Sequence, residues 1–219
     1  MEDKQKRIKE NLDKWIDFVN PQKLKDNMIV NSLYIANFEA LNDYIVDQPK
    51  SFFETGFDEN GTIVDPDYKE KVLDKDKKNP VTASLLWWKE QEAIDQTDID
   101  TYHSVRKFRN QVTHEMLTFL FEGSDELPKH FADLMQLKIK LDRWWTINIE
   151  IPTNPDLDDL EEINPEEVVT SSEMLHYLIS NILSEDEEKA NFFMNAFTEH
   201  RDSMEQSNNS NKDSKEEKS

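Results

Sequence analysis

Glycine is almost missing from this chain, with three occurrences among 219 residues. Sandwiches and barrels need many tight turns, and such turns favour glycine because it adopts backbone angles that other residues avoid. The scarcity of glycine therefore favours helices. Apolar residues make up only 36% of the chain, but aromatic residues make up 10%, with five Trp and twelve Phe. This aromatic share is too high for a disordered protein. We expect an all-α fold with a real core.

Apolar residues recur at helical spacing in several segments, which predicts a helical bundle. The longest segment runs from Pro21 to about Phe53, and the others cover about residues 4–19, 80–93, 98–121, 127–145 and 166–197. In the 98–121 helix, for which Thr97 is a plausible N-cap, one stripe is expected to face the core. This stripe consists of Val105, Phe108, Val112, Met116 and Phe119.

The segments between these helices predict little regular structure. Residues 54–79 contain two of the glycines and read as a long mobile loop with one short strand at 62–64. The strict alternation of residues 146–151 indicates a second short strand. An acidic connector covers 152–165 and a disordered tail covers 201–219. We therefore expect one helical domain over residues 1–200, with at most short β elements.

Composition excludes several classes of protein. The chain has no Cys, so disulfides and thiolate chemistry are excluded. We see neither a secretory signal nor an apolar run of about 18 residues, and so expect a cytoplasmic protein without membrane contact. The net charge of −21 counts against nucleic-acid binding. However, the excess of acids is concentrated in residues 150–188, which hold thirteen acids and no Lys or Arg. Residues 101–145 are nearly balanced, with seven Lys or Arg and six acids.

The run Arg109-Asn110-Gln111-Val112-Thr113-His114 lies in that balanced part of the chain. Arg binds phosphate oxygens in a fork, and His transfers protons near neutral pH. On a helix, Asn110 and His114 are i,i+4 neighbours, so the Asn side chain can orient the imidazole. The polar face also carries His103 and Arg106, which are candidate RNA contacts. The alternative is that all of these are ordinary solvated residues on a helix surface.

This run resembles the signature of the HEPN superfamily, in which four to six residues lie between an Arg, usually followed by a polar residue, and a His. The resemblance covers about residues 20–145, with 197 as its outer bound, and implies a helical bundle that forms a homodimer, with both motifs at the dimer cleft. It implies a metal-independent endoribonuclease, an RNA-cleaving hydrolase of toxin–antitoxin or antiviral defence systems, without a cofactor. Arg109 and His114 would be the catalytic pair, positioned by Asn110, and an antitoxin or defence protein would be a further partner.

Two alternatives stay open. Some HEPN proteins are inactive interaction modules, and the acid-rich 150–188 region would then bind a basic protein. The second alternative is that the motif is a coincidence and that the chain is an unrelated helical bundle. The remaining histidines, His130, His176 and His200, lack the spacing of metal ligands, and we predict no metal site. The Trp87-Trp88 pair and the first long helix are expected to provide interface surface for the dimer.

Overall fold

The computed structural model describes residues 20–59, 61–157 and 164–183, together with isolated positions before residue 20 and after residue 190. It is mostly helical, with one small sheet, as the all-α prediction requires. The chain divides into two compact units, Met1–Glu161 and Glu162–Ser219. Of the predicted helix at 4–19, only residues 5–7, 9, 11, 12 and 16 are described, and all of them are helical; of the tail at 201–219, only Arg201 is described. None of the described helices is long and apolar enough to cross a bilayer.

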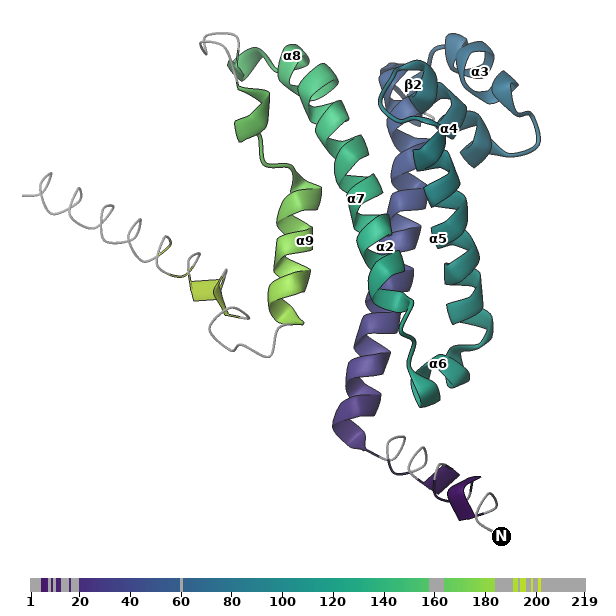
Figure 1. The fold of residues 1–219 in the computed structure, drawn as a ribbon. Coiled ribbons are helices and arrows are strands. Elements are labelled where there is room, and N and C mark those ends of the chain that lie inside the picture. Colours follow the sequence, from purple (N-terminus) through teal and green to yellow (C-terminus); the bar gives the residue numbers. More distant parts are fainter. Residues whose placement is uncertain are drawn as a thin grey trace, which may run out of the picture. The chain divides into compact units, whose positions relative to one another are not determined.

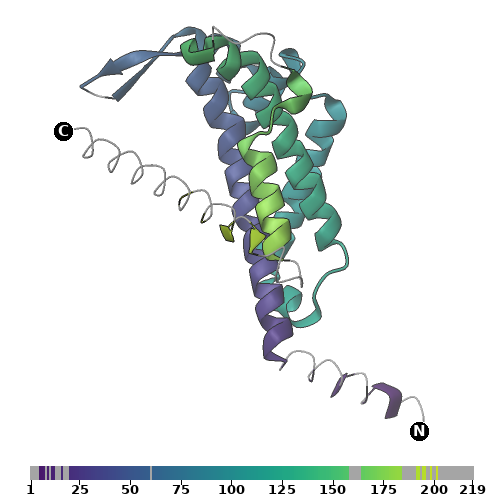
Figure 2. The same ribbon diagram turned by 90° about the vertical axis from the view of Figure 1, so that its left-hand side faces the viewer.

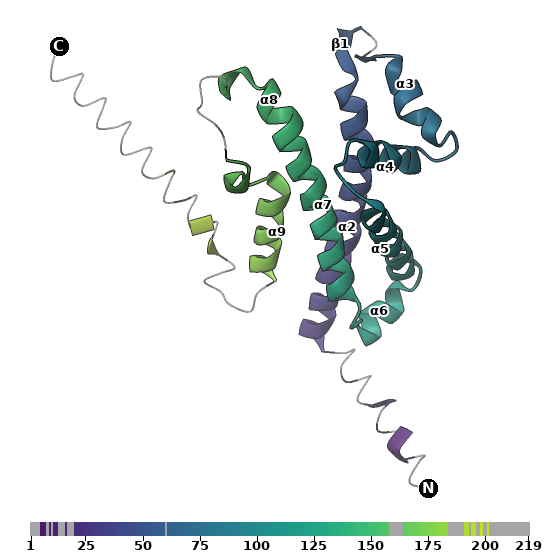
Figure 3. The same cartoon turned by 45° about the horizontal axis from the view of Figure 1, so that its top comes forward.

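Four long helices build the first unit: α2 (Pro21–Phe52), α4 (Pro80–Glu90), α5 (Gln96–His114) and α7 (Leu127–Trp145). Helix α2 is the longest and contacts α4, α5, α7 and the short α6 (Met116–Glu122). Figure 1 and Figure 3 show α5 and α7 running along α2. Helix α2 is therefore the element against which α5 is positioned.

The helix starts follow from local capping chemistry. The side chains of Asn20 and Asn79 each accept hydrogen bonds from two backbone N–H groups of the following first turn, and a Pro opens each helix. Helix α5 is capped by Asp95, which forms a reciprocal capping box with Asp98. The predicted cap at Thr97 is wrong, because the carboxylate of Asp95 accepts the backbone N–H group that a cap must satisfy.

The core centres on the indole of Trp88, which is fully buried. Its Nε1 donates a hydrogen bond of 3.0 Å to the backbone oxygen of Ile45 in α2. The rings of Trp87, Trp144 and Trp145 lie edge-on to it at 5.2, 5.6 and 5.7 Å. The prediction that Trp87-Trp88 provides interface surface is wrong, because both rings fill the core of one chain.

The predicted core stripe of α5 is confirmed. Val105, Phe108 and Val112 are buried, and Met116 and Phe119 pack partly buried against the same core. The continuous helix predicted over 98–121 is wrong, because α5 ends at His114 and α6 begins at Met116.

The predicted loop at 54–79 contains regular structure. Strands β1 (Glu54–Asp58) and β2 (Gly61–Val64) form an antiparallel hairpin, followed by α3 (Asp67–Lys71) and the 3₁₀ turn η1 (Leu73–Lys75). The strand predicted at 62–64 is confirmed, but the irregular loop around it is wrong. Tertiary contact explains the difference, because Val64 and Tyr68 pack against the core. Figure 2 shows the hairpin projecting from the end of the bundle.

The strand predicted at 146–151 is also wrong. These residues continue α7 as a π-helical turn, η2 (Thr146–Glu150), and then enter α8 (Ile151–Thr153) and the 3₁₀ turn η3 (Pro155–Leu157). Asn148 donates a hydrogen bond to the backbone oxygen of Trp144, four residues earlier, which favours the helical path. Within the described residues, no other strand lies beside this segment to form a ladder with it.

The second unit contains the 3₁₀ turn η4 (Pro165–Glu167) and helix α9 (Ser171–Ile182). Thr170 and Glu173 form a capping box at the start of α9. The helix predicted over about 166–197 is thus described over twelve residues. Residues 184–190 of the predicted segment lie outside the described part.

Candidate active site

The residues that the sequence singles out lie along α5, from His103 to its last residue, His114. His103, Arg106, Asn110 and His114 are exposed, and their spacing puts them on one side of the helix. This side is opposite the buried stripe. The structure therefore gives α5 the polar face that the sequence predicts.

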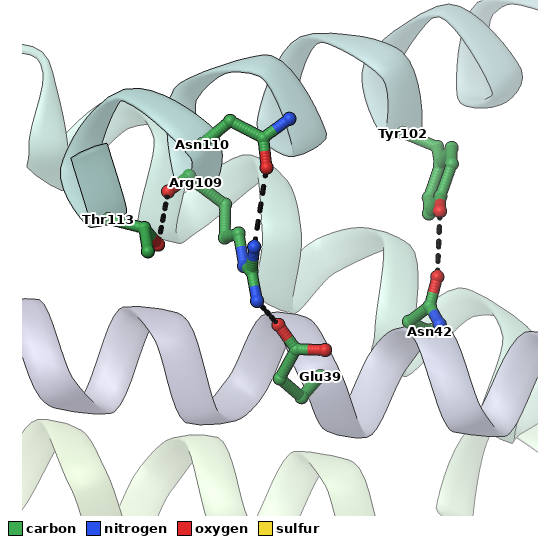
Figure 4. A network of polar contacts seen from close by, with 6 residues as sticks. All are labelled: Glu39, Asn42, Tyr102, Arg109, Asn110 and Thr113. Atoms are coloured by element: carbon green, nitrogen blue, oxygen red, sulfur yellow. Dashed lines mark hydrogen bonds and ion pairs between the residues drawn. The ribbon is translucent and has the colours of Figure 1, made fainter.

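Arg109 points away from that face, toward α2 (Figure 4). Its Nη2 forms an ion pair with the carboxylate of Glu39, and its Nη1 donates a hydrogen bond of 3.3 Å to Oδ1 of Asn110. The guanidinium carbon lies 5.8 Å from the centre of the Phe38 ring, within the range of a cation–π contact. The side chain is 28% exposed. Arg109 is thus held by three neighbours and still reached by solvent.

The remaining guanidinium nitrogen of Arg109 is not satisfied. Its Nε is buried, and none of the described residues accepts a hydrogen bond from it. A buried donor without a partner is uncommon and costs free energy. The two bonded nitrogens determine the position of this side chain, since Glu39 and Asn110 supply the acceptors.

Arg109 and His114 are not brought together within one chain. They are five positions apart on the α-helix, which corresponds to about 140° around the axis. No hydrogen bond or ion pair joins their side chains in the described part of the chain. One chain therefore presents an arginine on the α2 side and a histidine on the exposed side of the same helix.

The end of α5 fixes where His114 stands. Thr113 donates a hydrogen bond of 2.9 Å from its hydroxyl to the backbone oxygen of Arg109. Glu115 is the C-cap of α5, and its backbone N–H donates a hydrogen bond to the backbone oxygen of Gln111. His114 consequently lies at an exposed corner where the chain turns from α5 into α6.

Helix α2 sets the position of α5. Oη of Tyr102 donates a hydrogen bond of 2.8 Å to Oδ1 of Asn42 (Figure 4), and its ring stacks on Phe38 with 6.0 Å between ring centres. At the other end, Asn27 donates a hydrogen bond of 3.1 Å to the backbone oxygen of Leu120 in α6. These contacts lie on both sides of Arg109 along α5 and α6 and hold the motif against α2.

Sequence reasoning missed Glu39. It is an acid in a long helix, 70 positions before Arg109 in the sequence, and no local spacing rule connects the two residues. The only available signal was its place directly after Phe38, on a helix whose apolar stripe was expected to meet the core. An acid beside such a stripe is a candidate partner for an arginine on a neighbouring helix.

The site offers no ligand set for a metal. Among the described residues, no group of three or more His, Asp or Glu side chains is placed to hold a metal ion. A surface cavity at α3 and η1, lined in part by Lys69, Asp74 and Lys77, includes none of the predicted residues. Proton transfer by His114 and charge stabilisation by Arg109 are the chemistry that these side chains offer.

Comparisons with models of protein families, with curated proteins and with solved structures find no match to this chain.

Proposed function

We propose that this protein is a metal-independent endoribonuclease of HEPN type. The observation that carries the proposal is the arrangement on α5. His114 and Asn110 lie exposed on one face, while Glu39 holds Arg109 on the adjacent α2 side of the same helix. The sequence resemblance supplies the reaction, and these positions support the roles that it implies for each residue.

The proposed reaction uses the nucleophile that RNA carries. The 2′-OH attacks the neighbouring phosphorus as His114 takes its proton, and the bond from phosphorus to the 5′ oxygen breaks. A proton donated to that 5′ oxygen completes the step. The products are a 2′,3′-cyclic phosphate and a 5′-OH end. The guanidinium of Arg109 stabilises the negative charge that builds on the phosphate oxygens.

A second copy of the chain would complete this site. Because Arg109 and His114 point to different sides of α5, one chain supplies an incomplete set of groups. In a homodimer with the exposed ends of α5 facing each other, one His114 acts as base and its partner acts as acid. The bacterial toxin or defence role, with an antitoxin or defence protein as partner, rests on the resemblance alone.

The second candidate function is an inactive HEPN-like interaction module. One observation favours it: the charge of Arg109 is already paired with Glu39, which reduces its attraction for phosphate. Such a module would bind a protein partner and cleave no RNA.

RNA cleavage by purified His114→Ala protein tests the proposal. We expect cleavage to fall at least about a hundredfold, which is the low end of what a positioned general base contributes. The matched control is Gln111→Ala, an exposed residue of the same helix turn, which should cleave at the rate of the natural sequence. Equal cleavage by His114→Ala and the natural sequence would exclude the enzyme and leave the module.

Measuring RNA cleavage in the presence of a chelator gives a second test of the proposed reaction. Cleavage should persist in excess EDTA and should leave 2′,3′-cyclic phosphate ends, because the nucleophile belongs to the RNA. Activity that is lost in EDTA and returns with magnesium would assign the reaction to a different centre.

A further inference from the structure

The β1–β2 hairpin is an incomplete sheet. It contains two strands, and among the described residues no third strand extends either edge. An isolated two-stranded hairpin is marginally stable in water, and its outer edges present backbone N–H and C=O groups that can pair with another strand. Figure 2 shows the hairpin projecting beyond the helices, so an added strand would have room beside it.

Both faces of the hairpin expose an apolar side chain. Phe57 is 82% exposed and Ile63 is 44% exposed. In the register, Phe57 lies opposite Thr62 and Gly56 lies opposite Ile63, so the two apolar side chains point to opposite faces. A Cβ added at Gly56 would meet no atom within 4 Å, so the face next to Ile63 is uncovered there. An added strand, whose side chains alternate between faces, would contact Phe57 on one face and Ile63 on the other.

The hairpin is acidic. Residues 54–65 contain four acids and no Lys or Arg, namely Glu54, Asp58, Glu59 and Asp65. Strand β1 carries Glu54 and Asp58 on either side of Phe57, whereas β2 carries no charged residue. The outer edge of β1 therefore combines backbone groups that face away from β2, an exposed aromatic ring and negative charge.

We propose that the edge of β1 binds an extended, basic segment of another protein by adding it as a third strand. Backbone hydrogen bonds would hold the segment, apolar side chains would cover Phe57 and Ile63, and Lys or Arg would pair with Glu54 and Asp58. Charge argues against a second copy as the occupant. Two acidic hairpins would face each other, each on a chain of net charge −21.

This binding site is separate from the proposed catalytic one. It uses β1, at the end of α2, and none of the residues named on α5. The proposal goes beyond RNA cleavage, and each can fail alone, since His114→Ala should leave strand binding unchanged.

A peptide of alternating Lys and Val, titrated into the ¹⁵N-labelled full chain, tests the proposal. We expect its amide shift changes to concentrate in residues 54–64, with slower hydrogen exchange of β1 amides. Charge reversal by Glu54→Lys with Asp58→Lys keeps Phe57 and should weaken binding at least tenfold. Phe57→Ser removes the exposed aromatic ring and should also weaken binding. Its matched control is Leu117→Ser, because Leu117 is an apolar side chain on α6 that is 79% exposed. Leu117→Ser should leave binding unchanged.

Several results would overturn the proposal. Equal binding of a peptide with Pro at consecutive positions, which removes the N–H groups from both edges of the strand, would show that no strand is added. Shift changes spread over the acidic surface would show attraction by charge alone. Hairpin signals that change with protein concentration in the absence of peptide would assign the edge to a second copy. Each variant spectrum reports whether the hairpin itself still folds.

Discussion

The hydroxyl of Tyr34 donates a buried hydrogen bond of 2.8 Å to the backbone oxygen of Val105. This bond joins α2 to the middle of α5, one helical turn before Arg109. The ring of Tyr34 also meets Phe108 edge-on at 5.4 Å and tilts toward Phe131 at 6.1 Å. Tyr34 is thus a point at which α2, α5 and α7 meet.

Tyr34→Phe should lower the free energy of unfolding by about 1 kcal/mol, the usual net contribution of one hydrogen bond. The ring stays in place, and the oxygen of Val105 can keep its bond within the helix, so a larger loss is not expected. Urea unfolding measures the difference. Tyr68→Phe is the control: Tyr68 is half-buried, no described residue bonds to its hydroxyl, and its effect should stay below about 0.5 kcal/mol. Equal losses in both variants would contradict the role given to Tyr34.

The ion pair between Glu39 and Arg109 gives a second prediction. A double-mutant cycle with Glu39→Gln and Arg109→Gln should show a favourable coupling of about 0.5–1 kcal/mol. The value is modest because Glu39 is 45% exposed, and solvent screens the pair. The coupling should shrink in 1 M salt. A coupling of zero at low salt would mean that Glu39 does not hold Arg109 in solution.

The starts of α2 and α4 were predictable because their signals are local, whereas the cap of α5 was placed at Thr97 and not at Asp95. Asn20-Pro21 and Asn79-Pro80 combine a capping side chain with a residue suited to the first turn, and both helices begin there. The core stripe of α5 was likewise readable from spacing. Apart from the strand at 62–64, the hairpin and α3 could not be predicted from spacing. Their short segments depend on the packing of Val64 against a core that distant helices form.

For the candidate site, the sequence indicated which residues to consider but not which side chains contact each other. His114 and Asn110 are exposed as helical spacing predicts. The partner of Arg109 was out of reach, because contact with Glu39 depends on how α2 and α5 pack. The strict alternation at 146–151 misled for a related reason: period two predicts a strand only where a partner strand is present.

His130 gives a prediction about pH. Its ring stacks on Phe108 with 4.1 Å between ring centres. Burial, assisted by the charge of Lys129, lowers the pKa of His130. Below its ordinary pKa of about 6.5 the unfolded chain takes up a proton that the folded chain resists. The stability that the folded chain has with His130 neutral is therefore fully present above about pH 6.5 and is progressively lost as the pH falls below that value.

His130→Phe keeps an aromatic ring against Phe108 and removes the titration. The difference in free energy of unfolding between the natural sequence and the variant should therefore change between pH 7.5 and pH 5, with the natural sequence losing more. Urea unfolding at both pH values measures it. A difference that is the same at both values would show that His130 titrates alike in the folded and unfolded chain.

Arg106 gives a prediction about RNA binding that is distinct from cleavage. It is exposed on the same side of α5 as His114, and no ion pair holds it within the described residues. A phosphate contact there would make Arg106→Gln weaken binding to all RNA sequences alike. It would also lower the slope of log affinity against log salt by about 0.7, the contribution of one contact to a single strand. The His114→Ala background allows binding to be measured without cleavage. Lys50→Gln, an exposed cation at the far end of α2, should leave both affinity and slope unchanged. If the two variants lower the slope equally, the attraction comes from overall charge, and Arg106 makes no specific contact with the RNA backbone.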